Sequence, residues 1–310
     1  MADRPTRFKR PVLLIVGCGD VGLRAARLLR GRWRLVALTS DAARVPALRA
    51  AGIVPLTGDL DRPASLGRLA GIADAVLHLA PPPGSGPTDT RTAHLVQALA
   101  RSARARRIVY GSTSGVYGDC GGERVAETHT LQPATDRARR RVDAEQRLLH
   151  FGRSHGVAVT ILRIPGIYAL GRRGGDPRER LARGTPVLAV EDDVHTNHIH
   201  ADDLARACAA ALHRGPAPRA VNVSDDSALK MGAYFDLAAD RFALSRPPRL
   251  ARAEAATQLS PMQMSFLSES RRLDNERMKR ELRLVLRYPT VVEGLAGDAP
   301  APTSKGIIGA

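Results

Sequence analysis

The chain has 310 residues, of which 44% are hydrophobic and 25% are charged, so it is long and apolar enough to bury a large core. The formal net charge is +16, but the arginines are spread along the whole length and are not interleaved with aromatic residues, which argues against a nucleic-acid-binding protein. Three distant cysteines, Cys18, Cys120 and Cys208, exclude a disulfide framework and favour a reduced, cytoplasmic setting, and no apolar run predicts a membrane span.

The first half of the chain alternates short apolar runs with helical patterns. Residues 12–16, VLLIV, predict a strand buried on both faces, and residues 21–30 predict the helix that follows it. This alternation implies right-handed crossovers, so the expected fold class is α/β, a Rossmann-like doubly wound parallel sheet with helices on both faces. Further strands are expected at 34–38, 53–59, 75–80, 107–112 and 157–164, and further helices at 92–103 and 135–153.

The regular alternation ends after Pro165. We interpret residues 166–296 as a small C-terminal α/β cap on the substrate side, packed as one structural unit on a dinucleotide-binding domain at residues 11–165. Residues 1–10 are expected to form a flexible basic tail and residues 297–310 a disordered one. The second half predicts a helix at 201–214 with Asp202 or Asp203 as N-cap, a strand at 220–225, and helices at 231–242 and 269–282.

Three glycines follow the first strand with G-x-G-x-x-G spacing. The first allows a tight turn, the second lets the backbone approach a pyrophosphate, and the third lets the helix pack against the strand. The helix N-terminus offers free N–H groups to the phosphates. Because the motif lies between a predicted strand and a predicted helix, it predicts dinucleotide binding. The loop residues expected to bind the cofactor are Gly17, Cys18, Gly19, Asp20, Val21 and Gly22.

The end of the second predicted strand bears on the choice between NAD and NADP. An acidic residue there would bind the ribose 2′-hydroxyl of NAD. This sequence has Thr39 and Ser40, then Asp41 and Arg44, and Asp41 is expected to cap the next short helix. Because hydroxyls and an arginine suit a 2′-phosphate, NADP is the preferred cofactor and NAD the alternative.

Several further segments lie in a characteristic order: GDL (58–60), HLAPPP (78–83), YGSTSGVYG (110–118), LRIPGIYALGR (162–172) and HIHADDLARA (198–207). Together they resemble the extended short-chain dehydrogenase/reductase family, the NAD(P)-dependent epimerase/dehydratase group, and the glycine spacing resembles its atypical members. The resemblance covers about residues 11–215. It implies that Thr113 holds the position of the catalytic Ser or Thr. It also implies that Asp59 and Leu60 flank the adenine, that Leu79, Ala80 and Pro81 line the cofactor cleft, and that Pro165 and Ile167 border the nicotinamide.

The sequence departs from that family at its Tyr-x-x-x-Lys pair. Aligning the long helix on Glu145 puts Arg141 at the lysine position and Arg137 at the tyrosine position. Arginine does not release a proton near neutral pH, so Arg137 cannot replace a tyrosine acid/base. Arg141 can still donate hydrogen bonds to the ribose, and it is a candidate catalytic and cofactor-binding residue. Arg139 and Arg140 are interpreted as a solvated helix face.

Two tyrosines follow predicted strands, at the carboxyl ends where ligands bind in such sheets. Tyr117 and Tyr168 could replace the missing acid/base, and Tyr117 is retained as a catalytic candidate. For each of them, a half-buried loop residue is the preferred interpretation. In nucleotide-sugar enzymes of the family, an arginine often stands four residues before the histidine that His200 matches. This chain has Thr196 at that position, which puts that substrate class in doubt.

His195, His198 and His200 lie beside acidic residues, but the last two alternate as in a strand, so no metal site is expected. Two functions remain open. The first is an NAD(P)-dependent oxidoreductase or epimerase-like enzyme with a degenerate Arg137/Arg141 pair, acting on an unknown small molecule, and the retained Thr113 favours it. The second is a non-catalytic NADP(H)-binding redox sensor or regulatory protein, favoured by Arg137. Neither a nucleic acid nor a membrane is an expected partner, and a monomer or homodimer is expected.

Overall fold

A computed structural model describes residues 10–297; the tails expected at 1–10 and 297–310 fall almost wholly outside the described residues. The centre of the fold is one parallel sheet of seven strands in the order β11-β7-β5-β4-β1-β2-β3. The order reverses on either side of β1, as it does in a doubly wound fold. The strands are β1 (Val12–Val16), β2 (Arg34–Thr39), β3 (Val54–Thr57), β4 (Ala75–His78), β5 (Arg107–Thr113), β7 (Ala158–Ile164) and β11 (Arg219–Asn222).

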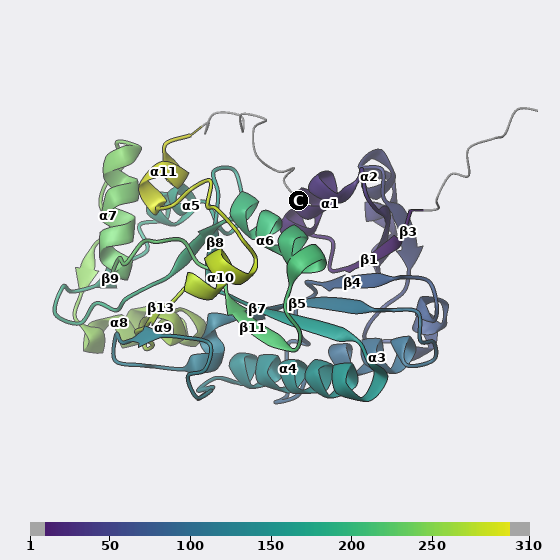
Figure 1. Ribbon diagram of the computed structural model, residues 1–310. Coiled ribbons are helices and arrows are strands. Elements are labelled where there is room, and N and C mark those ends of the chain that lie inside the picture. The colour runs from purple at the N-terminus through teal and green to yellow at the C-terminus, as the bar shows by residue number, and fades with distance from the viewer. Residues whose placement is uncertain (1–9, 298–310) are drawn as a thin grey trace, which may run out of the picture.

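Helices cover both faces of this sheet (Figure 1). One face carries α1 (Asp20–Leu29), α2 (Val45–Ala50) and α6 (Ala201–Arg214), and the other carries α3 (Thr90–Leu99) and α4 (Asp136–His155). The expected Rossmann-like fold class is therefore confirmed. Each of these five helices lies between two successive strands of the main sheet and carries the chain back to the same edge, so every strand pair in that sheet is parallel.

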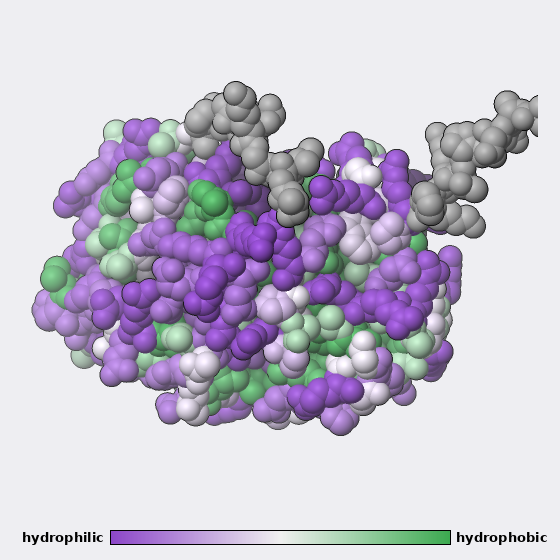
Figure 2. Space-filling view, in the orientation of Figure 1, coloured by the Kyte–Doolittle hydropathy of each residue, from purple (hydrophilic) through white to green (hydrophobic). Residues whose placement is uncertain are grey.

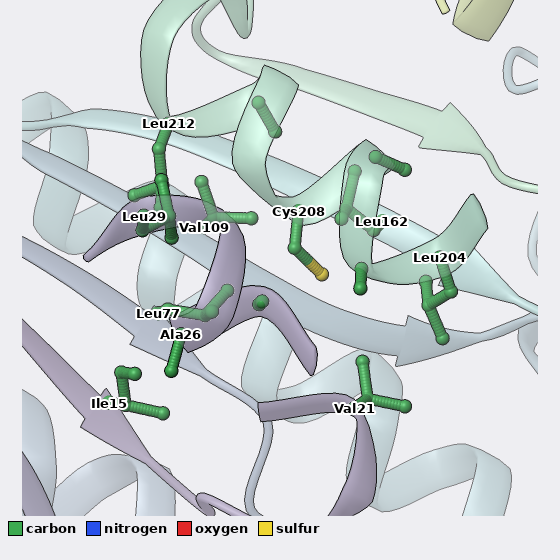
Figure 3. Packing of buried hydrophobic residues seen from close by; sticks show 14 of the residues in the cluster. Ile15, Val21, Ala26, Leu29, Leu77, Val109, Leu162, Leu204, Cys208 and Leu212 are labelled. Atoms are coloured by element: carbon green, nitrogen blue, oxygen red, sulfur yellow. The ribbon is translucent and has the colours of Figure 1, made fainter. Parts of the chain in front are cut away.

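Each strand contributes to two separate cores, because successive side chains point to opposite faces. Leu13 and Ile15 pack beneath α1 and α6, whereas Leu14 and Val16 face α3 and α4. Figure 3 shows the first of these cores, with Cys208 of α6 lying among side chains from the sheet and α1. This explains why the strand sequences are apolar throughout rather than alternating.

The second half of the chain, joined by the short strand Arg124–Val125 from the first half, builds a smaller cap at one end of the sheet (Figure 1). Its own core includes Tyr168, Tyr234 and Phe235. Its short strands pair as β10-β8, β12-β9 and β13-β6. The elements are β6 (Arg124–Val125), β8 (Gly166–Tyr168), α5 (Pro177–Ala182), β9 (Val187–Leu188), β10 (His198–His200), α7 (Met231–Arg241), β12 (Arg249–Leu250), α8 (Arg252–Gln258), α9 (Pro261–Leu267), β13 (Arg272–Leu273), α10 (Glu276–Glu281) and α11 (Val291–Leu295).

The boundary expected at residue 165 does not separate two sheets. α6 packs against α1 and β11 extends the main sheet beside β7, so the chain returns to the first layer after leaving it. The helix predicted at 269–282 is wrong in its first half, where β13 pairs with β6 and the helix begins only at Glu276. The N-cap of α6 is His200, whose Nδ1 accepts a bond from the Asp202 N–H, rather than Asp202 or Asp203.

The surface is strongly polar. Figure 2 shows one face on which hydrophilic residues predominate and hydrophobic ones are scattered in small groups. Within residues 10–297, no helix combines the length and the apolar character that crossing a bilayer requires.

Candidate functional site

The glycine loop joins β1 to α1 and lies directly against the end of β4. Gly17 has φ +85°, and a Cβ placed on it would lie 2.3 Å from the backbone N of Ala80. A side chain on Gly22 would approach the Gly17 carbonyl at 3.2 Å. Gly19 differs, because a Cβ there would meet nothing within 4 Å. Close packing thus explains the glycines at Gly17 and Gly22. Of the three, only Gly19 has open space next to its backbone.

The N-terminus of α1 faces this open side. Gly19 is the N-cap and makes no side-chain cap bond, so the first N–H groups of the helix, at Asp20 and Val21, have no intrahelical partner. The Asp20 carboxylate lies 3.0 Å from Arg24 Nε and 3.2 Å from Arg172 Nε. Two guanidinium groups therefore neutralise the acidic residue beside the open space at Gly19.

The end of β2 places Arg44 over the same loop. Its guanidinium donates to the carbonyl oxygen of Cys18, and burial raises the pKa of the Cys18 thiol to about 11, so the thiol is protonated at neutral pH. Asp41 accepts a bond from the Ala43 N–H and so caps the short helix as expected. Thr39 is buried and its hydroxyl bonds the Asp41 backbone, which leaves Ser40 as the exposed hydroxyl beside Arg44.

The ends of β3 and β4 complete the cleft walls. Asp59 is half-buried and accepts a bond from the Asp61 N–H, while the neighbouring Leu60 is buried. Leu79 and Ala80 follow β4 and form the surface on which Gly17 rests. The next residue, Pro81, is exposed. The expected cofactor-binding residues after strands β1 to β4 therefore come together at the carboxyl edge of the sheet.

A cavity of about 510 Å³ opens between this edge and the cap. It brings together four residues expected from the sequence, Thr113, Arg141, Pro165 and Ile167. Thr113 ends β5 and is half-buried, and its Oγ1 accepts a weak bond of 3.3 Å from the Gly115 N–H. Among residues 10–297 this hydroxyl donates no hydrogen bond, so its proton can be donated to a ligand.

The two arginines at the positions of the missing pair both line the cavity. Arg141 Nη1 donates to the Gly111 carbonyl at 2.7 Å and to the Tyr110 hydroxyl at 3.0 Å, which fixes it against β5. Arg137 is exposed and lies over the ring of Phe266, 4.3 Å from the centroid. The interpretation of Arg140 as solvated is wrong, because it is buried and donates to the Gly86 carbonyl at 2.5 Å.

Tyr117 is not part of the cavity and is fully buried. Its hydroxyl donates to Asn222 Oδ1 at 2.7 Å and accepts from Arg163 Nη1 at 2.9 Å. Burial raises its pKa to about 12. These contacts do not support a catalytic role for Tyr117. Arg163 also pairs with Glu145, a buried network that sequence reasoning missed because its members lie far apart in the chain.

The cap supplies cavity residues that the sequence did not single out, among them Arg180, Arg183, Tyr234 and Arg271. Tyr168 also lines the cavity, but it is buried and its hydroxyl bonds the Thr290 carbonyl at 3.3 Å. No local pattern in the sequence marks these groups, because the arginines are spread along the whole chain.

The three histidines have separate surroundings: two pack on tyrosine rings, and the third lines the cavity. His198 stacks on Tyr234 with centroids 4.0 Å apart, and burial lowers its pKa to about 3. His200 packs on Tyr288 at 3.8 Å, and His195 lines the cavity. In the part of the chain that the structure describes, no group of three or more His, Cys, Asp or Glu side chains is arranged to hold a metal ion.

The fold and the glycine loop define a doubly wound protein of the Rossmann type. Residues 13–224 match the model of the NAD dependent epimerase/dehydratase family. The chain therefore belongs to this family, the extended short-chain dehydrogenases/reductases, as the sequence motifs predicted. Among curated proteins, none matches the sequence significantly.

Solved structures share this architecture. A conserved protein of unknown function from Silicibacter pomeroyi is 30% identical, with a TM-score of 0.77 over 92% of this chain and 96% of the other. A nucleoside-diphosphate-sugar epimerase from Pseudomonas aeruginosa is 18% identical, with a TM-score of 0.76 over 93% and 95%. UDP-glucuronic acid 4-epimerase from Bacillus cereus, solved with NAD, is 17% identical, with a TM-score of 0.72 over 91% and 95%. At 17% and 18% identity, the two epimerases support the fold alone.

Proposed function

We propose that this protein binds NADP(H) along the carboxyl edge of its sheet and uses it in an oxidoreductase reaction on a small molecule. The single observation that carries this proposal is the glycine loop, in which Gly17 is pressed against Ala80 while Gly19 has open space before it. A dinucleotide pyrophosphate fits such a gap at a helix N-terminus. The Bacillus cereus epimerase of the same fold was solved with NAD, which is consistent with this assignment.

The preference for NADP over NAD rests on Arg44. Its guanidinium is held over the loop by the Cys18 carbonyl, beside the exposed hydroxyl of Ser40. Asp41, the carboxylate that could bind a ribose 2′-hydroxyl, is engaged in capping the Ala43 N–H. Arginine pairs well with phosphate oxygens, so the geometry favours the cofactor with the 2′-phosphate.

The expected roles at the cavity follow from donor chemistry. The bound nicotinamide would supply or accept hydride at a substrate carbon. Thr113 would donate a hydrogen bond to the substrate oxygen, and Arg141, fixed against the Gly111 carbonyl, has further donors for the ribose. Pro165 and Ile167 would border the nicotinamide ring. Arg137 stabilises negative charge on a ligand but does not transfer a proton, so water is the proton source in this account.

A second function, a non-catalytic NADP(H)-binding sensor or regulatory protein, is favoured by the state of the cavity tyrosines. Tyr168 and Tyr234 are both buried, and desolvation raises the pKa of each well above its usual range. Neither is suited to exchange a proton at neutral pH. A protein that has kept the cofactor cleft and lost the tyrosine would still respond to the redox state of its cofactor.

Hydride transfer separates the two functions. The enzyme should transfer deuterium from NADPH stereospecifically labelled at C4 to a member of a carbonyl panel, detected by mass spectrometry. Thr113→Val should lower that rate by roughly 100-fold, because a hydrogen bond to the developing oxyanion is lost. Thr257→Val, on α8 and outside the cavity lining, is the matched control and should leave the rate unchanged. Tight NADPH binding without any deuterium transfer would favour the sensor.

A further inference from the structure

The 510 Å³ cavity carries more positive than negative charge on its walls. Five arginines line it, against three carboxylates. Two of these carboxylates are already paired, Asp176 with Arg178 at 2.6 Å and Glu269 with Arg271 at 2.8 Å. The third, Glu179, accepts a bond from the Gly174 N–H at 2.9 Å. The lining arginines are Arg137, Arg141, Arg180, Arg183 and Arg271.

Four of these five lining arginines have no carboxylate within salt-bridge distance in the described part of the chain, and only Arg271 is paired, with Glu269. Arg180 donates instead to the Pro186 carbonyl and lies 4.5 Å from the centroid of the Phe235 ring. Its Nε is buried without an acceptor among residues 10–297. A cavity walled by guanidinium groups that lack counterions attracts anions from solution.

Arg137 lines the cavity at the helix position where the family carries its tyrosine. It lies one helical turn before Arg141, on the same face of α4. Its guanidinium rests on the Phe266 ring, and among the described residues it makes no hydrogen bond or ion pair, so its five donors are uncommitted. Partial burial lowers the pKa of Arg137, an effect that Glu269 opposes and that Arg141 reinforces.

We infer that Arg137 anchors an oxyanion, a carboxylate or a phosphate monoester, on the small-molecule substrate of this cavity. Taking the bound anion as the substrate rests on the proposed function. A guanidinium binds either oxyanion through two parallel hydrogen bonds, which a tyrosine at this helix position would not offer. A nucleotide diphosphate is disfavoured by the resemblance to the family's nucleotide-sugar enzymes, because the uncharged Thr196 lines the cavity at the position where those enzymes often carry an arginine. The replaced tyrosine thus marks a changed substrate class rather than a lost site.

The test is calorimetric titration of the whole protein with malonate, with inorganic phosphate, and with neutral malonamide, in the presence and absence of saturating NADP⁺. Saturation fills the glycine loop, the other place where phosphate would bind. We expect malonate or phosphate to bind and malonamide not to bind; which of the two binds more tightly identifies the oxyanion. Arg137→Gln should weaken that binding by roughly tenfold or more, since a charge-assisted bidentate contact is lost.

Arg139→Gln is the matched control. Arg139 lies on the same helix, carries the same charge, and pairs with Asp136 in solvent at 2.8 Å, so its loss should leave anion affinity unchanged. Equal effects of the two variants, binding of malonamide as tight as that of malonate, or tighter binding of UDP-glucose would each overturn the inference. If NADP⁺ fails to bind, the proposed function fails, while the Arg137 dependence measured without cofactor still decides the anion site.

Discussion

Arg163 of β7 and Glu145 of α4 form a buried ion pair, with Nη2 2.9 Å from Oε2. Their side chains are 7% and 3% exposed, so hydration by water stabilises neither charge to any large extent. Burial alone would lower the pKa of Arg163, but Glu145 raises it above its usual value, and the guanidinium stays charged. Because Arg163 also donates to Tyr117 and to the Glu127 carbonyl, this pair fixes the chain that follows β5, the strand that ends in Thr113.

Glu145→Gln should therefore destabilise the protein by about 3–5 kcal/mol, because it leaves a buried guanidinium uncompensated. Asp136→Asn is the control, since it removes the exposed partner of Arg139 on the same helix and should cost about 1 kcal/mol or less. Urea denaturation of both variants measures the difference. Small and equal losses of unfolding free energy in the two variants would mean that the Arg163–Glu145 pair does not hold the segment that follows β5.

Gly17 and Gly19 should respond differently to alanine. Gly17→Ala adds a Cβ 2.3 Å from the Ala80 backbone at φ +85°, so its melting temperature should fall before any ligand is added. Gly19→Ala meets no atom within 4 Å and should keep the wild-type melting temperature. Its affinity for NADPH should nevertheless fall by about tenfold or more, because the Cβ occupies the approach of the pyrophosphate. Unchanged NADPH affinity in Gly19→Ala would contradict the placement of the cofactor.

Arg44→Ala should reduce the ratio of NADPH to NADH affinity by roughly tenfold, through loss of the partner for the 2′-phosphate. The ratio is the informative quantity, because Arg44 also bonds the Cys18 carbonyl and its loss can weaken both cofactors. Arg49→Ala, an exposed arginine of α2, is the control. Fluorescence titration with each cofactor gives the ratios, and a value equal to that of the wild type would remove Arg44 from the phosphate site.

Asp225 should make stability fall with rising pH. Burial raises its pKa from the ordinary value of an aspartate to about 8, so the folded protein holds a proton that the unfolded chain releases. The stability contribution of this group is full below about pH 4 and is lost as the pH rises through about 8. The melting temperature of the wild type relative to Asp225→Asn should thus decline between pH 5 and pH 8. A difference that is constant with pH would show that Asp225 is ionised in the folded state.

Local patterns predicted most of the first layer. The apolar run at 12–16 and the helical pattern at 135–153 lie close to β1 and α4, because one is set by burial on both faces and the other by a helix of 20 residues with clear ends. The glycine spacing identified the loop because the turn needs a particular backbone conformation, such as the positive φ of Gly17, and this is a local property of the sequence. The two elements that return to the main sheet, α6 and β11, were harder to place. Whether a strand joins that sheet depends on a pairing partner far away in the sequence, here β7 for β11.

The burial of the polar residues could not be predicted from sequence. Tyr117 bonds Asn222, 105 positions away, and Arg140 bonds Gly86, 54 positions away. A basic helix face and a loop tyrosine look solvent-exposed until those partners are known. The cap of α6 was misassigned because Asp203 instead accepts the N–H groups of Arg287 and Tyr288.

Isothermal titration calorimetry of the purified protein with NADPH and with NADH tests most directly whether the carboxyl edge of the sheet binds a nicotinamide dinucleotide. We expect one site per chain, tighter binding of NADPH than of NADH, and loss of that binding in Gly19→Val, whose side chain would fill the open space before the loop. Absence of heat with both cofactors, or an affinity unaffected by Gly19→Val, would contradict this expectation.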